Sequence, residues 1–132
     1  MKFTSYFLKP ASLLLFTLLL SASKCNKEKP SIPSPKITFD LSRIDEEGLG
    51  NRPGSQVAID YEYCIPADEK KASEIKKIDP SLKIMHKSKG RIGCSGIEWL
   101  CLGNTHQKNW RKILDKLAEK DYIKRIDRAF FE

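Results

Sequence analysis

Apolar and polar residues alternate between positions 57 and 63, which predicts a β-strand whose odd-numbered side chains share one face. Asp68 then precedes apolar positions three residues apart, and Pro80 follows them, so a short helix is expected between these two residues. From residue 110 to residue 118 the apolar positions recur with the spacing of an amphipathic helix, the strongest helix pattern in the chain. Weaker strand patterns occupy residues 82–86, 97–102 and 122–130.

The predicted order of these elements, β-α-β-β-α-β, resembles the ferredoxin-like split βαβ arrangement. The resemblance covers residues 57–130 and implies an α+β sandwich, in which two helices cover one face of an antiparallel or mixed sheet. As we interpret it, the first and third strands are parallel neighbours in that sheet. We therefore expect one ferredoxin-like domain between residues 56 and 132.

The first 24 residues have the three zones of a secretory signal peptide. Lys2 and Lys9 supply positive charge, residues 11–20 are almost entirely apolar, and three small residues follow. The apolar run is about half of the roughly 20 residues that a helix needs to cross a bilayer. We therefore expect a signal that is removed on export rather than a permanent transmembrane helix.

Cys25 follows this signal directly. Residues 20–25 resemble the lipobox of bacterial lipoproteins, with Lys24 at the position where a small residue is usual. The resemblance implies acylation of Cys25, and the acyl chains would hold the protein on a membrane, facing the periplasm or the cell exterior. Cleavage after Ala22 or Ser23 would instead give a soluble exported protein.

Residues 25–55 are rich in proline, serine and glycine, which predicts a tether and a loop, with a short strand expected around residues 37–41. The whole chain of 132 residues carries a net charge of +7, which favours an anionic partner. Because an exported protein meets little nucleic acid, we expect no nucleic-acid partner.

Four cysteines, Cys25, Cys64, Cys94 and Cys101, are expected to pair where the compartment is oxidising. Cys94 and Cys101 would lie roughly 20 Å apart along one strand, beyond the reach of about 7 Å for a bridge. On parallel neighbouring strands, Cys64 and Cys101 would end at the same edge and share the face away from the helices. We therefore predict a Cys64–Cys101 disulfide, and as an alternative a redox or metal site formed by this pair with His106.

Zinc sites usually have two cysteines two to four residues apart, and this spacing is absent, so we assign no metal ligand and no cofactor. Lys87, Lys89 and Arg91 cluster near a predicted turn, where they either bind an anionic headgroup or cell-wall polymer or form a solvated hairpin tip. Trp99, predicted on the open face of the sheet, is a candidate anchor for a partner protein unless the segment around Phe39 covers it.

The chain shows no paired carboxylates, catalytic triad, phosphate-binding loop or metal cluster, so we identify no catalytic residue. The leading hypothesis is a small exported protein of the cell envelope, tethered to a membrane, that acts as a binding module. The first alternative is a thiol- or metal-handling protein. The second is an inhibitor, because the hydrophobic spacing of residues 114–126 is similar to that of protease-propeptide inhibitor domains.

Overall fold

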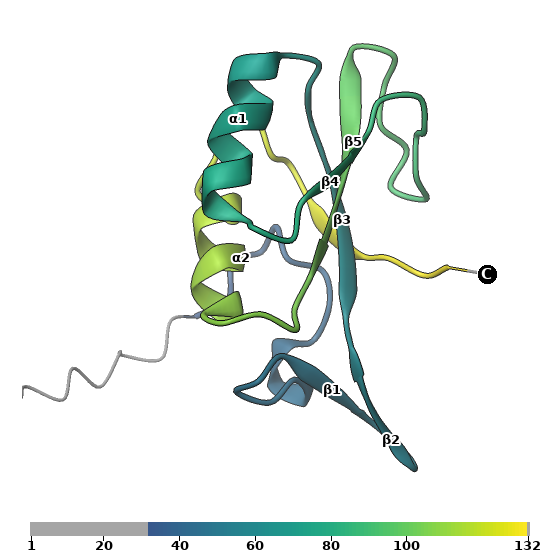
Figure 1. Cartoon of the computed structure of the whole chain (residues 1–132), viewed down its shortest axis with the longest axis vertical. Helices are drawn as coiled ribbons and strands as arrows, with labels where there is room; N and C mark the ends of the chain where they lie inside the picture. Colours follow the sequence, from purple (N-terminus) through teal and green to yellow (C-terminus); the bar gives the residue numbers. More distant parts are fainter. Residues whose placement is uncertain (1–31, 132) are drawn as a thin grey trace, which may run out of the picture. The chain divides into compact units, whose positions relative to one another are not determined.

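The computed structural model describes residues 32–131, and the expected signal and Cys25 lie outside these residues. Figure 1 shows the order of the helices and strands. They are the 3-10 helix η1 (Leu41–Arg43), strands β1 (Leu49–Arg52), β2 (Ser55–Ala58) and β3 (Asp60–Pro66), helix α1 (Glu69–Ile78), strands β4 (Lys83–Met85) and β5 (Glu98–Asn104), helix α2 (Trp110–Ala118) and strand β6 (Ile126–Arg128).

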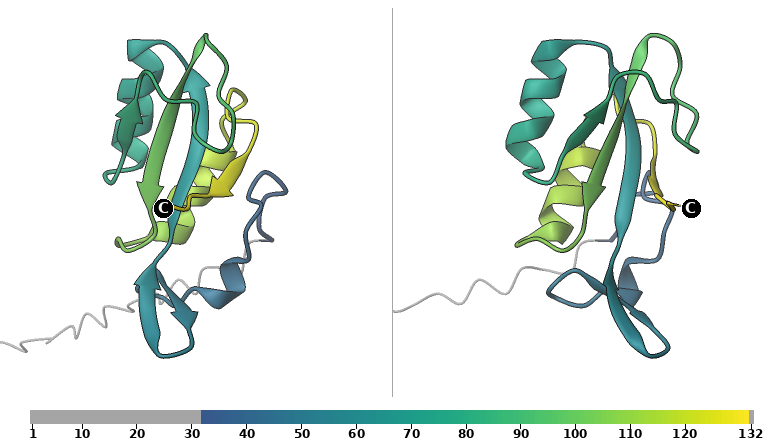
Figure 2. Two further views of the ribbon diagram at one scale, coloured as in Figure 1. Left: turned by 90° about the vertical axis from the view of Figure 1, so that its right-hand side faces the viewer. Right: turned by 45° about the vertical axis from the view of Figure 1, so that its right-hand side comes forward.

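Two helices and two antiparallel sheets make the described part an α+β protein, which confirms the predicted class. The larger sheet has the strand order β4-β5-β3-β6, and all neighbouring strands in it are antiparallel. β1 and β2 form a separate hairpin that extends beyond the start of β3 (Figure 1). Both helices lie on the same side of the larger sheet, so its second face is turned away from them (Figure 2).

Local signals explain where the helices begin and end. The Asp68 side chain accepts hydrogen bonds from the backbone N–H groups of Lys70 and Lys71, which caps α1. The helix ends before Pro80, because the residue preceding a proline disfavours the helical conformation. In α2 the side chains at helical spacing form one buried stripe: Trp110, Ile113, Leu114, Leu117 and Ala118.

The core lies between the two helices and the first face of the sheet. Tyr61, Tyr63 and Ile65 of β3 point into it and are almost completely buried, as their alternation with polar residues predicts. The segment before the expected domain also contributes, since Ile37 and Leu41 belong to the same core. The fold therefore begins well before residue 56.

The N-terminal part of the described chain runs beside β6. Ile37 forms a parallel bridge with Ile126, and the Ile126 carbonyl accepts a hydrogen bond of 3.0 Å from the backbone N–H of Thr38. The backbone N–H of Ile126 donates in turn to the Lys36 carbonyl at 2.8 Å. The expected short strand at residues 37–41 is thus reduced to a bridge followed by η1. Within residues 32–131, neither helix has the length and apolar character needed to cross a membrane.

Candidate binding surface

The second face of the sheet carries the polar side of β3 together with the neighbouring residues of β4 and β5. Residues opposite each other in an antiparallel pair share a face, and Glu62 lies opposite Leu102 while Cys64 lies opposite Leu100. On the next strand, Met85 lies opposite Leu100. Residues 86–97, which connect β4 to β5, extend over this face (Figure 2).

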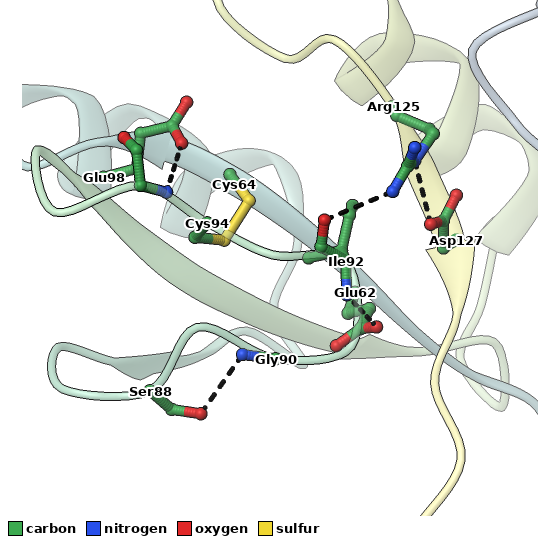
Figure 3. The surroundings of a disulfide bond; sticks show 10 residues. Glu62, Cys64, Ser88, Gly90, Ile92, Cys94, Glu98, Arg125 and Asp127 are labelled. Atoms are coloured by element: carbon green, nitrogen blue, oxygen red, sulfur yellow. Dashed lines mark hydrogen bonds and ion pairs between the residues drawn. A yellow bond between two sulfur atoms is a disulfide. The ribbon is translucent and has the colours of Figure 1, made fainter.

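A disulfide and a small hydrogen-bond network attach this loop to the sheet (Figure 3). Cys64 of β3 is bonded to Cys94 of the loop, with their Cα atoms 5.5 Å apart. The Glu62 carboxylate, with 4% of the residue exposed, accepts a hydrogen bond of 2.9 Å from the backbone N–H of Ile92. The Arg125 guanidinium donates to the Ile92 carbonyl at 3.2 Å. The loop is therefore fixed at its centre from two sides.

Between this loop and the C-terminal segment lies an open groove of about 450 Å³. Three large apolar side chains on it are partly or largely exposed: Met85 at 45%, Phe130 at 50% and Phe131 at 68%. The Arg128 guanidinium lies over the ring of Phe130, 4.9 Å from its centroid. The residues that line the groove are Glu62, Met85, Ser88, Lys89, Gly90, Arg91, Leu100, Leu102, Ala129, Phe130 and Phe131.

Basic residues lie beside these apolar side chains, and Lys89 and Arg91 line the groove with them. The stretch from Pro80 to Ile97 contains three lysines and one arginine and has no acidic residue. All four basic side chains are exposed. We call the combined feature the basic–aromatic surface and define it by seven residues: Lys83, Met85, Lys87, Lys89, Arg91, Phe130 and Phe131.

No family model, curated protein or solved structure matches this chain. The functional assignment therefore depends on the chemistry of the surface itself.

The predicted Cys64–Cys101 disulfide is wrong. β3 and β5 are antiparallel rather than parallel, and Cys101 lies opposite Tyr63, on the face that carries the helices. Cys64, the next residue along β3, points to the second face. The two sulfur atoms are thus separated by the sheet, whereas Cys94 approaches Cys64 from the loop above the second face.

The three residues of the predicted thiol or metal site do not meet. Cys64 is in the disulfide, Cys101 is a buried free thiol, and the exposed His106 has its Nδ1 atom 3.1 Å from the Glu47 carbonyl oxygen. Burial raises the pKa of the Cys101 thiol to about 12, and the negative charge of Asp79 adds to the effect. Within residues 32–131, no group of three or more histidine, cysteine or acidic residues is arranged to hold a metal ion.

Trp99 is also on a different face from the one predicted. It lies opposite Ile65, packs against the core, and makes an edge contact with His86, with the ring centroids 4.4 Å apart. Its half-buried ring is therefore not a free anchor on the open face. The exposed apolar residues of that face are Met85, Phe130 and Phe131 instead.

Sequence reasoning missed these three residues, although one signal was present. Neighbouring residues in an extended chain point to opposite sides, so Phe130 and Phe131 could not both enter one core. Lys87, Lys89 and Arg91, which the sequence places near a turn, are exposed residues of the connection between β4 and β5. Their role in binding stays a prediction.

A second polar cluster, on the helix side, is structural. The buried Asp79 carboxylate accepts hydrogen bonds from the Tyr61 hydroxyl at 2.7 Å, the Ser81 hydroxyl at 2.6 Å and the Gln107 side-chain amide at 3.0 Å. Burial, together with the neighbouring Asp79 charge, raises the pKa of Tyr61, so this hydroxyl remains a donor. These bonds tie the end of α1 to β3 and to the loop after β5.

Proposed function

We propose that this chain is a small exported protein of the cell envelope whose domain is a non-catalytic binding module for an anionic envelope component. The observation that carries the proposal is the basic–aromatic surface, where Lys89 and Arg91 line the same groove as three exposed apolar side chains and two further exposed lysines lie close to them along the chain. A local excess of positive charge attracts an anionic partner, and a contiguous exposed apolar patch marks an interaction site.

Export agrees with the cysteine chemistry. Disulfides persist in oxidising compartments outside the cytoplasm, and the domain contains the Cys64–Cys94 pair. The signal-like residues 1–24 also support export from the cytoplasm. The lipobox-like segment supports acylation at Cys25. We include a membrane tether through residues 25–35 in the proposal. The acyl group would keep the domain at the membrane while the basic–aromatic surface binds.

The proposal also includes the finer fold assignment. The strand order β4-β5-β3-β6, with α1 connecting β3 to β4 and α2 connecting β5 to β6, supports a ferredoxin-like domain preceded by the β1–β2 hairpin. Open sheet faces in such folds are available for binding, but the fold itself does not determine a function.

The first test separates this surface from the general charge of the protein. We expect the double variant Lys87→Glu/Lys89→Glu to elute from a phosphocellulose column at a clearly lower salt concentration than the unmodified chain. The matched control is Lys70→Glu/Lys77→Glu, which changes the net charge equally but on exposed positions of α1.

The control should remain close to the unmodified chain, because its lysines belong to α1, which lies on the other side of the sheet from the basic–aromatic surface. Equal shifts for the two double variants would mean that retention reports net charge alone. That result would remove the basis for a specific binding surface.

A further inference from the structure

We propose that the partner of the basic–aromatic surface is an anionic phospholipid bilayer, onto which the domain lies with Phe130, Phe131 and Met85 inserted between the headgroups. This inference rests on the proposed function and names the class of its partner. It concerns the folded domain itself and is independent of acylation at Cys25.

The exposure of the apolar side chains favours a bilayer. Phe130 and Phe131 both line the groove, and they are 50% and 68% exposed. Removing aromatic surface of this kind from water is favourable, and the boundary between headgroups and acyl chains accepts such rings. A bilayer can cover both rings and Met85 at once, because all three line the same groove.

The basic residues beside these apolar side chains also favour lipid. Three of the four basic residues are lysines, and lysine is depleted in the cores of protein–protein interfaces. At a membrane surface, by contrast, long lysine side chains lie with their stems along the apolar boundary and their ammonium groups among the phosphates. The combination of lysines with exposed phenylalanines therefore favours lipid over a protein partner.

The loop of the basic–aromatic surface is held in one conformation before it binds. The Cys64–Cys94 disulfide and the Glu62–Ile92 hydrogen bond fix the loop that carries Lys87, Lys89 and Arg91. Binding then costs little ordering of the backbone, and the loop and the C-terminal segment can meet one plane together.

The test uses a shortened chain that begins at Asn26 and so has neither the signal nor Cys25. All buried apolar residues of the described chain lie between Ile37 and Ala129, so this chain keeps the whole core. The probe is cosedimentation with vesicles of equal parts phosphatidylglycerol and phosphatidylcholine, and with vesicles of phosphatidylcholine alone. We expect binding to the first and not to the second.

The variants separate charge from insertion. One basic residue near an anionic bilayer contributes about fivefold to binding, so Lys87→Glu/Lys89→Glu should lower the partition coefficient by about 25-fold or more. Phe130→Ser/Phe131→Ser should lower it by roughly tenfold or more, since the serine hydroxyl gains nothing from the acyl boundary. The control is Ile97→Ser, because Ile97 is 81% exposed but does not line the groove.

Ile97→Ser and Lys70→Glu/Lys77→Glu should bind within about twofold of the unmodified chain, since neither change touches the surface. Circular dichroism checks that the phenylalanine variant is folded, as expected for substitutions at exposed positions. Met85→Ser is a second variant of the same apolar patch and should also weaken vesicle binding.

Three results would overturn the inference. Absence of binding to the anionic vesicles, with the loop variant still distinguished on phosphocellulose, would leave the proposed function standing with a partner other than lipid. Unchanged vesicle binding by the phenylalanine variant would reduce the interaction to adsorption by charge, without insertion. Failure of both assays would also remove the proposed function.

Discussion

Replacing Cys64 and Cys94 by serine should lower the free energy of unfolding by about 3.6 kcal/mol at 25 °C, from the loop-closure entropy for their separation of 30 residues. The disulfide closes a loop that includes α1, β4 and the connection above the second face. In its absence, the loop is held to the sheet by hydrogen bonds such as the one between Ile92 and Glu62.

Urea unfolding followed by circular dichroism measures this loss. With a typical urea dependence for a small domain, the midpoint should fall by more than about 1 M. A reductant should destabilise the unmodified protein by the same amount, since it breaks the same bond. It should have no effect on the double serine variant.

Cys101→Ser is the decisive control. Its thiol is buried on the helix face and free, so this variant should respond to the reductant as strongly as the unmodified protein does. If Cys101→Ser is insensitive to the reductant, Cys101 takes part in the bond and the assignment of Cys64 to Cys94 is refuted. A reductant response below about 1 kcal/mol would refute the entropic estimate.

Two further predictions concern local geometry and pH. Gly54→Ala should cost about 1–2 kcal/mol in thermal unfolding, because its φ of +83° strains any other residue and nothing lies within 4 Å of an added Cβ. Gly48→Ala, at a φ of +82°, should cost several kcal/mol more, since its Cβ would collide with the backbone carbonyl of Thr105, and equal losses for the two variants would contradict this. Hydrogen bonds from Lys120 and Tyr122 lower the pKa of Glu74 from its usual value of 4.5, so the stabilisation is present above that pH and is lost as the pH falls through the lowered pKa. Stability measured in acid should decline less steeply in Glu74→Gln, and an unchanged decline would count against the pairing.

The helices and the central strand could be predicted because their signals are local. Asp68 and Pro80 mark the ends of the segment that contains α1, and the apolar spacing from residue 110 defines α2. β3 alternates strictly because one of its faces packs under the helices. Such patterns depend on neighbours within a few residues along the chain, so sequence alone contains them.

The faces of β5 could not be predicted in the same way. Leu100 and Cys101 are neighbours on this strand, and both are buried. The helices cover one of them, and the disulfide-linked loop lies over the other. A strand that is apolar on both faces gives no alternation from which to choose an orientation. The error in orientation, with the parallel assignment of β3 and β5, produced the wrong disulfide partner.

The proposed binding surface could be predicted only in part. Its basic residues form a run along the chain and were visible as such. Its apolar half joins Met85 to Phe130 and Phe131, which are more than forty positions later in the sequence. Only the order of strands in the folded sheet brings these two segments to one groove, and no local pattern contains that order.

The position of Cys101 behind the sheet has a consequence for maturation. An unfolded chain offers Cys101 to either of the other two domain thiols, and early oxidation can trap a mispaired species. Once β3 and β5 are paired and the helices pack on them, Cys101 is buried and can no longer form a disulfide with Cys64 or Cys94. The yield of protein with the Cys64–Cys94 disulfide therefore depends on whether folding precedes oxidation. Folding in the reduced form followed by oxidation should give a homogeneous product, whereas oxidation during collapse should give a mixture of isomers.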